Sequence, residues 1–221
     1  TLVLKGVARR LVRDPLGRVY CHLHPDGAAW LPGGASNTGG EALAQRFGDE
    51  RLAALDPQAL ARSPSELIIY PLARRGERFP FHAPQAEGFA LGEAPDEATL
   101  YAAHLEGLAY VERLAYETLE TLGAPVGGII YAVGGATHSR AGLQIRADVL
   151  GRCLRVPAVP SGAMGAAILA ARACAFASVA EAARAMVRRE LEVEPRVALA
   201  AAYTERYQRF LAACRERGYL S

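Results

Sequence analysis

The sequence has few of the features that assign a protein to a class by composition alone. Only one of its 25 basic residues, Lys5, is a lysine, and the formal net charge is +2. So small a charge gives no electrostatic reason to expect nucleic acid or a membrane surface as a partner. There is also no uninterrupted apolar run of about 18 residues and no charged start followed by a short apolar segment, so neither membrane insertion nor secretion is indicated.

Cysteine motifs and the common phosphate-binding motifs are missing as well. The four cysteines stand far apart without a CxxC pair, which predicts reduced thiols and a cytoplasmic location. Neither GxxxxGK[ST] nor GxGxxG occurs, so P-loop and Rossmann folds have no support.

What the chain does have is length and apolar content, with 221 residues of which 51% are hydrophobic, enough for a substantial core. Segments 2–13 and 18–24 are predicted to be strands of an opening hairpin, joined by a turn at 14–17. A glycine-rich bend, "WLPGGASNTGG", is predicted to lead into a helix near Asn37 or Thr38, and the proline-rich segment 56–97 to be mostly loop around one strand, "LIIYPL".

The second half has a more regular pattern. Leucines and alanines at spacings of three and four predict a long amphipathic helix that ends at Gly123, with Glu106 and Glu112 on its polar face. Then follow a strand ("GGIIYAV"), a helix over 139–150, a strand ("CLRVPAV"), and helices from Ser161, Ser178 and about Val197. Helices that alternate with short buried strands predict a layered α/β domain.

Two glycine-rich turns are candidate ligand sites. In "VGGATHS", Val133 is predicted to close a buried strand and Ser139 to cap the next helix, which leaves bare backbone where a nucleotide could lie. "WLPGGASNTGGE" offers amides and short polar groups to a phosphate or sugar. The alternatives are a tight turn without a ligand for the first and a flexible turn with a helix cap for the second.

Other residues have weaker patterns. His22 and His24 face the same side of a strand but lack further ligands for a metal site, and His138 is either a ligand contact or an exposed loop residue. Asp56 lies in a turn-forming context, and Asp148 is expected to be a surface or packing acid. The small residues of "SGAMGAAILAA" predict a helix packed closely on the sheet.

Taken together, "GGATHS", "QIRADVLGRCLRVP" and "SGAMGAAILAA" closely resemble the carboxyl-terminal domain of FGGY-family carbohydrate kinases. The helix with "LEGLAYVER" resembles the region of that family's second signature, and the resemblance extends over essentially all 221 residues. "WLPGGASNTGG" and "YPLARRGERFPF" are similar to the ribulokinase-like subgroup, which includes proteins labelled xylulose-kinase-like.

This resemblance implies an actin-like, ribonuclease H-like α/β fold, a mixed sheet flanked by helices, as one of two lobes that close over ATP and Mg²⁺. The residues matching the family's nucleotide site are Gly134, Gly135, Ala136 and Ser139 for adenosine, Gly34, Ala35, Ser36 and Asn37 for ribose and phosphates, and Thr1 as the last residue of a Gly-Thr-Thr phosphate turn.

The resemblance also implies what the chain leaves out. The family's catalytic aspartate and its amino-terminal sugar-binding lobe precede the phosphate turn, so residues 1–221 are expected to be the second lobe alone, with no catalytic residue, no metal ligand and no activity by itself. An apolar face along residues 1–40 should then be exposed.

The whole protein is expected to be a cytoplasmic kinase that transfers the γ-phosphate of ATP to a ketopentose such as D-ribulose, with sugar, ATP and the other lobe as partners. A homodimer is left open. The alternatives are a non-catalytic actin-like nucleotide-binding module and an FGGY kinase for xylulose or glycerol.

Overall fold

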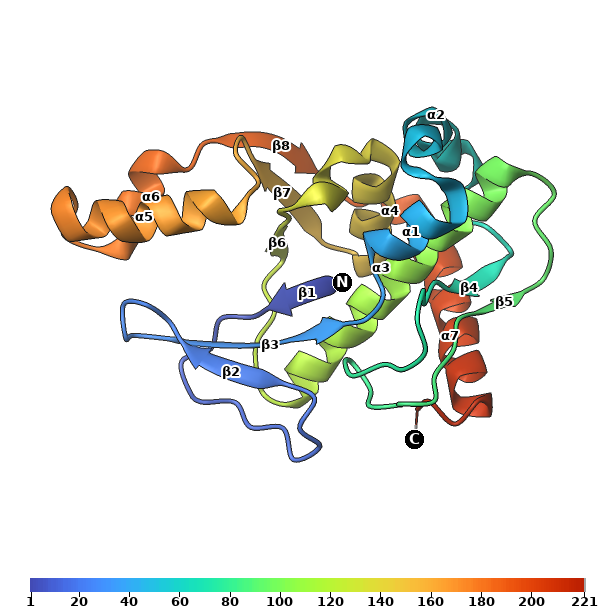
Figure 1. The fold of residues 1–221 in the computed structure, drawn as a ribbon, viewed down its shortest axis with the longest axis horizontal. Helices are drawn as coiled ribbons and strands as arrows, with labels where there is room; N and C mark the ends of the chain where they lie inside the picture. The colour runs from blue at the N-terminus through green and yellow to red at the C-terminus, as the bar shows by residue number, and fades with distance from the viewer. Residues whose placement is uncertain (221) are drawn as a thin grey trace.

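The strands of the computed structural model, which describes residues 1–220, form three separate sheets around one long helix (Figure 1). The strands are β1 (Leu2–Lys5), β2 (Tyr20–Leu23), β3 (Trp30–Ser36), β4 (Ile68–Tyr70), β5 (Phe89–Leu91), β6 (Ile129–Tyr131), β7 (Cys153–Pro157) and β8 (Arg189–Val193). The α-helices are α1 (Gly40–Phe47), α2 (Asp49–Ala59), α3 (Glu97–Thr121), α4 (Arg140–Leu150), α5 (Gly162–Cys174), α6 (Val179–Met186) and α7 (Ala200–Glu216). Short 3₁₀ helices are η1 (Leu60–Arg62), η2 (Gly135–His138) and η3 (Val197–Leu199). The predicted α/β class is confirmed, although three sheets replace the single mixed sheet.

The first sheet places β3 between β1 and β2, antiparallel to both. The predicted turn is present, since the Gly17 N–H donates to the Asp14 carbonyl at 3.0 Å. The strands on either side of it do not pair with each other, so the predicted opening hairpin is wrong. The glycine-rich bend is itself the central strand, because β1 and β2 both take their hydrogen-bond partners from it.

The second sheet places β7 between β6 and β8, parallel to β6 and antiparallel to β8. Leu4 of β1, Ile130 of β6 and Leu154 of β7 are buried in one hydrophobic cluster, so the first two sheets share a core. The third sheet pairs β4, the one strand predicted in the proline-rich region, with β5. Strands β5 and β8 and helix α2 were not predicted.

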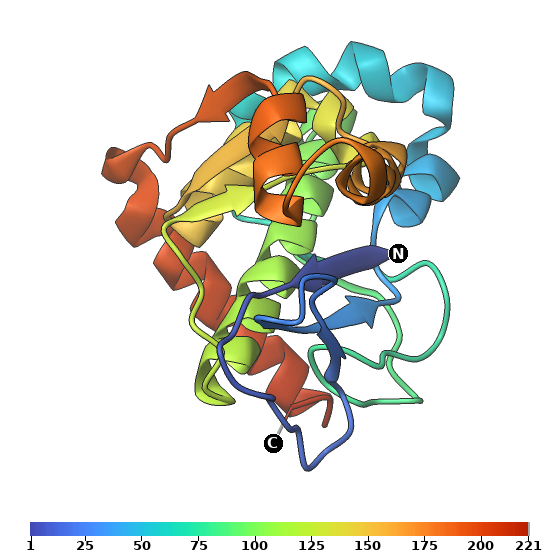
Figure 2. The same ribbon diagram turned by 90° about the vertical axis from the view of Figure 1, so that its left-hand side faces the viewer.

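Helix α3 runs through the middle of the molecule, in contact with α1, α2, α4 and α7 (Figures 1 and 2). The Asp96 side chain caps it by accepting from the Thr99 N–H at 2.7 Å, and Gly123 follows its end with a φ of 86°. The predicted helix and its glycine end are confirmed. Glu106 and Glu112 are buried rather than on an exposed polar face, because other helices and loops cover both sides of α3.

The predicted helices of the second half are also confirmed. Ser139 caps α4 by accepting from the Gly142 N–H at 2.7 Å, and Ser178 caps α6 by accepting from the Glu181 N–H at 3.1 Å. Helix α5 begins at Gly162, next to the predicted Ser161.

The prediction that helix α5 packs on a sheet is wrong. The helix lies against α6, and the two project together from the rest of the molecule (Figure 1). None of its described residues is buried, and Leu169 is 43% exposed. The small side chains of α5 therefore serve no sheet contact in this structure.

Large apolar side chains are exposed along the first 40 residues, as expected. Val3, Val7 and Leu16 are 58%, 61% and 70% exposed. Within residues 1–220, no helix has both the length and the hydropathy needed to cross a bilayer.

Candidate functional site

The turn between β6 and α4 presents backbone rather than side chains. Strand β6 ends at Tyr131, and Val133 is 59% exposed, so it does not close a buried strand as predicted. Gly134 has a φ of 87°, a conformation that favours glycine. Ser139 ends the turn as the cap of α4. The predicted glycine turn followed by a capped helix is therefore present.

The backbone conformation of Gly135 does not require glycine. Its φ is not in the left-handed region, and a Cβ built there would meet no described atom within 4 Å. Gly135 instead lines a cavity. The exposed backbone of Gly135 therefore borders the cavity without a side chain beside it.

The cavity has a volume of about 340 Å³ and lies between the turn, the start of α1, helix α2 and the first half of α3. Leu43, Leu52, Leu105 and Leu108 from three helices make its walls largely apolar. A concave apolar space with a few convergent polar groups is typical of a small-molecule site.

Asp56 of α2 forms the polar end of the cavity. Its carboxylate accepts a hydrogen bond from the Ser139 hydroxyl, another from the Ala141 N–H at 3.2 Å, and a long one from the Tyr101 hydroxyl at 3.4 Å. Burial, reinforced by the nearby Asp56 carboxylate, raises the pKa of Tyr101 to about 12, so its hydroxyl keeps the proton that it donates. This network joins the two sides of the cavity across 83 residues of sequence.

Arg146 also lines the cavity, but its guanidinium is paired with the buried carboxylate of Glu112. Its Nε and Nη2 donate to the two carboxylate oxygens of Glu112 at 2.7 and 2.8 Å. Burial opposes the charge on Arg146, but the Glu112 carboxylate outweighs that effect and raises the pKa of Arg146. The other charged groups of the lining, Asp49 and Asp56, are carboxylates. The cavity therefore suits the uncharged part of a ligand.

The first part of the second glycine-rich segment forms β3 and lies outside the cavity lining, whereas its last glycine, Gly40, lines the cavity. A Cβ on Gly34 would stand 2.4 Å from the Phe79 ring, so packing alone requires glycine there. Ala35 pairs with Val3 of β1. The helix predicted to begin at Asn37 or Thr38 begins at Gly40, because β3 continues through Ser36.

The polar groups after β3 are held by Glu77, a buried carboxylate that the sequence did not single out. It accepts from the Ser36 hydroxyl at 2.6 Å, the Asn37 N–H at 2.8 Å and the Tyr70 hydroxyl at 2.7 Å. Thr1 lies against the same segment, since a Cβ on Gly39 would stand 2.8 Å from the Thr1 nitrogen. This segment is therefore fixed before any ligand arrives.

The structure thus brings part of the predicted site together. Gly135, Ala136 and Ser139 line the cavity, and Gly134 adjoins them. The predicted residues outside its lining are Gly34, Ala35, Ser36, Asn37 and Thr1.

Among the lining residues that the sequence did not assign to the site, Asp56 makes the most hydrogen bonds across the cavity. The expectation of a turn at Asp56 is wrong, because α2 includes both Asp56 and the following Pro57 in its last turn. A helix register that turns Asp56 toward Ser139 depends on tertiary packing. No local sequence signal could have found it.

The histidine and cysteine positions do not form part of this site, except for His138, which lines the cavity. His22 lies 3.4 Å from the Lys5 ammonium, and His24 pairs with Asp26 at 2.7 Å. Asp148 is a buried packing acid paired with Arg196 at 2.7 Å.

Metal-capable side chains come together in a group of three at one place in the described part of the chain. A group of three such residues comprises Cys153, Glu192 and Glu194, outside the cavity lining. A thiol is a poor ligand for Mg²⁺, which prefers oxygen.

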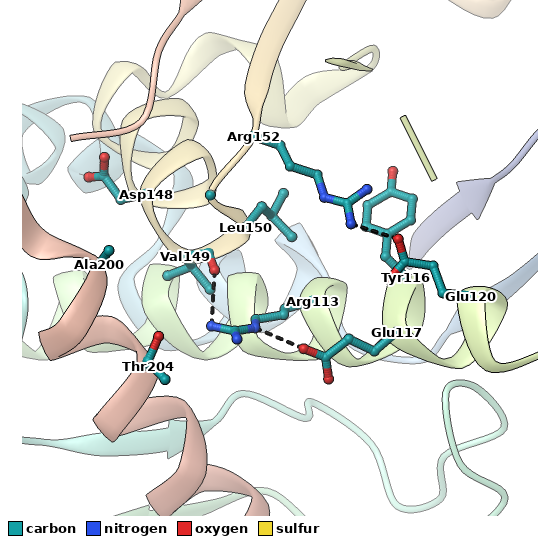
Figure 3. Close-up of a pocket in the computed structure, with 11 residues that line it drawn as sticks. Arg113, Tyr116, Glu117, Glu120, Asp148, Val149, Leu150, Arg152, Ala200 and Thr204 are labelled. Atoms are coloured by element: carbon teal, nitrogen blue, oxygen red, sulfur yellow. Dashed lines mark hydrogen bonds and ion pairs between the residues drawn. The ribbon is translucent and has the colours of Figure 1, made fainter. Parts of the chain in front are cut away.

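A second cavity, of about 240 Å³, lies at the carboxyl-terminal end of α4 between α3 and α7 (Figure 3). Arg113 donates to Glu117 at 3.0 Å and to the Val149 carbonyl at 3.4 Å, and Arg152 donates to Glu120 at 2.7 Å. Both arginines are paired within the wall, so the lining of this cavity holds no unpaired arginine for an anionic ligand.

Comparison with known proteins finds solved structures of similar fold. A xylulose kinase from Rhodospirillum rubrum is 29% identical with a TM-score of 0.81, over 97% of this chain and 45% of that one. A protein described as a xyloylose kinase from Brucella ovis is 25% identical with a TM-score of 0.85, over 99% and 46%. The glycerol kinase of Plasmodium falciparum with ADP shares the fold at 16% identity and a TM-score of 0.75, over 99% and 45%.

The chain therefore spans less than half the length of these solved structures. The model of the FGGY family of carbohydrate kinases, C-terminal domain, matches residues 22–174, which is more than half of the chain. This chain belongs to the FGGY family of carbohydrate kinases.

Proposed function

We propose that this chain is the ATP-binding lobe of a sugar kinase with an actin-like fold. The observation that supports it is the cavity between the Gly134–Ser139 turn and helices α1 to α3. Its leucine walls suit a flat purine, and the bare backbone at Gly135 and Ala136 suits close approach of the base and ribose.

The residues present fit the nucleoside part of ATP better than its phosphates. The cavity volume of about 340 Å³ and its apolar lining match a base with its sugar. The phosphates would lie toward the start of α1 and the segment Gly34–Asn37, with Thr1 next to them, as the family resemblance implies. ATP supplies the phosphoryl group. Mg²⁺ would accompany the phosphates, as the family resemblance implies, and we assign it no ligand in this chain.

The acceptor of the phosphoryl group is proposed to be a ketopentose. D-ribulose is the leading candidate because of the ribulokinase-like segments, and D-xylulose is the second because two similar solved structures are described as kinases of that sugar. The sugar site and the catalytic aspartate are proposed to belong to a second lobe outside this chain. Phosphoryl transfer requires both substrates to be positioned together, so one lobe is insufficient.

The test compares two proteins. We expect the 221-residue chain to bind ATP without consuming it when D-ribulose or D-xylulose is added, and the two-lobed kinase to consume ATP with one of these sugars. Sugar-dependent turnover by the chain alone would contradict the proposal that the sugar site and the catalytic aspartate belong to a second lobe. Nucleotide binding without turnover by either protein would favour the non-catalytic module.

A further inference from the structure

We propose that Asp56 is a specificity-determining residue of the nucleotide site, because its carboxylate occupies the anion-binding start of α4 and directs the uncharged end of the nucleotide to that place. The inference rests on the proposed nucleotide-binding function. It adds a role for a residue of α2 that the resemblance does not assign.

The start of a helix normally attracts a phosphate, because its first N–H groups lack partners and its dipole is positive there. At α4 the N–H groups of Ala141 and Gly142 are already satisfied by side chains. The Ala141 N–H donates to Asp56, the Gly142 N–H donates to the Ser139 hydroxyl, and that hydroxyl donates to Asp56 in turn. A phosphate could bind there only by displacing the protein's own carboxylate.

The charges around this end of the cavity also disfavour a phosphate. Arg146, the arginine of the cavity lining, is paired bidentately with Glu112. A phosphate at this end of the cavity would face the Asp56 carboxylate and no unpaired arginine in the lining. A purine or ribose carries no charge and avoids that repulsion.

The start of α1 shows the opposite arrangement on another side of the same cavity. Its cap, Gly39, contributes no side-chain hydrogen bond, Gly40 lines the cavity, and the Glu41 carboxylate of its first turn lies outside the lining and pairs with Arg74. The cavity therefore lies between one helix start covered by a carboxylate and one without a side-chain cap. This asymmetry gives the nucleotide a preferred direction, with its base toward α4.

The test uses adenosine as the neutral probe and inorganic pyrophosphate as the anionic probe, both measured by titration calorimetry on the 221-residue chain. In the unaltered chain we expect adenosine to bind and pyrophosphate not to displace it. In Asp56→Asn we expect adenosine to bind about tenfold more weakly, because one carboxylate oxygen becomes an amide donor that faces other donors. Pyrophosphate should now displace adenosine, so the ratio of the two dissociation constants shifts by more than about tenfold.

The control is Asp49→Asn, the same change at the other carboxylate of the lining, which should leave the ratio within about threefold. A purely structural role for Asp56 would weaken both ligands by the same factor, and that result would overturn the proposal. So would an equal shift of the ratio in Asp49→Asn.

A second variant covers the case in which Asp56→Asn fails to fold, which circular dichroism would show. Ser139→Ala removes the hydroxyl but keeps the carboxylate, so pyrophosphate should still be rejected while adenosine binds more weakly. Displacement of adenosine by pyrophosphate in Ser139→Ala would contradict the role of Asp56. If the unaltered chain binds neither adenosine nor ATP, the proposed function itself fails and the inference falls with it.

Discussion

Glycine residues in this chain serve three different physical purposes, which only the structure separates. Gly34 is required by the Phe79 ring packed against it, and Gly134 by its positive φ. Gly135 has neither constraint and faces the cavity. The sequence pattern predicted the glycine turn and the Ser139 cap that follows it, and the structure has both. It treated Gly34 in the same way, although close packing explains that glycine, because sequence cannot show what lies opposite a residue.

Replacing Gly135 by leucine tests its role directly. Gly135→Leu should fill the cavity and weaken adenosine binding by about a hundredfold, while the free energy of unfolding changes by less than about 0.5 kcal/mol. Calorimetry and denaturant unfolding measure the two quantities. Gly128→Leu is the matched control, since Gly128 also has open space around its Cβ but lies outside the cavity lining. Equal losses of binding in both variants would show that the cavity is not the site.

Glu106 of α3 is a fully buried carboxyl group. Its Oε1 accepts from the Ser65 N–H at 2.9 Å, but Oε2 has no partner among the described residues, nor do the nearby hydroxyls of Tyr110 and Tyr203. Burial raises the pKa of Glu106 to about 8, against smaller lowering effects of the Ser65 hydrogen bond and of Arg206. The folded protein therefore holds this carboxyl group neutral at pH 7.

The pH dependence follows from the sign of that shift. The unfolded chain ionises Glu106 near pH 4.5 and the folded chain only near pH 8, so the neutral group's contribution to stability is complete below about pH 4.5 and lost as the pH rises to about 8. Glu106→Gln should flatten this decline, by up to about 1.4 kcal/mol for each pH unit in the window. Denaturant unfolding at several pH values measures it, with the exposed Glu205→Gln as control. If Glu106→Gln and the unaltered protein decline in parallel, Glu106 is not neutral in the fold.

At the scale of elements, the sequence predicted best where a local pattern and the tertiary environment agree. Helices α3, α4 and α6 have capping side chains and apolar periodicity, and all three form. Helix α2 was missed because Pro57 falls in its last turn, and its packing on α3 outweighs that local signal. The missed strands β5 and β8 depend on pairing with β4 and β7. Such partners are distant in sequence, so local patterns cannot identify them.

The position of α5 leads to a prediction about stability. Because no described residue of α5 is buried, Leu169→Gln should change the free energy of unfolding by less than about 0.5 kcal/mol. Leu143→Ala in α4, where the side chain is fully buried, should cost about 2–5 kcal/mol. Denaturant unfolding of both variants makes the comparison. A large loss in Leu169→Gln would mean that α5 packs on the rest of the chain in solution.

At the scale of the whole molecule, the order of the sequence blocks predicted the family, and the match over residues 22–174 confirms it. The site was predicted only on the α4 side. The α2 and α3 sides, with Asp56, Tyr101 and Leu105, come together through packing between segments about 50 residues apart. Neither length nor composition contains that information.

Nucleotide binding in the cavity beside the Gly134–Ser139 turn can be followed through the backbone amide chemical shifts of the ¹⁵N-labelled chain during titration with ATP. We expect saturable changes at Gly135, Ala136, Ser139 and Gly40, with no comparable changes around Arg113 and Arg152 in the cavity of Figure 3. An unchanged spectrum at millimolar ATP, or changes confined to that second cavity, would contradict it.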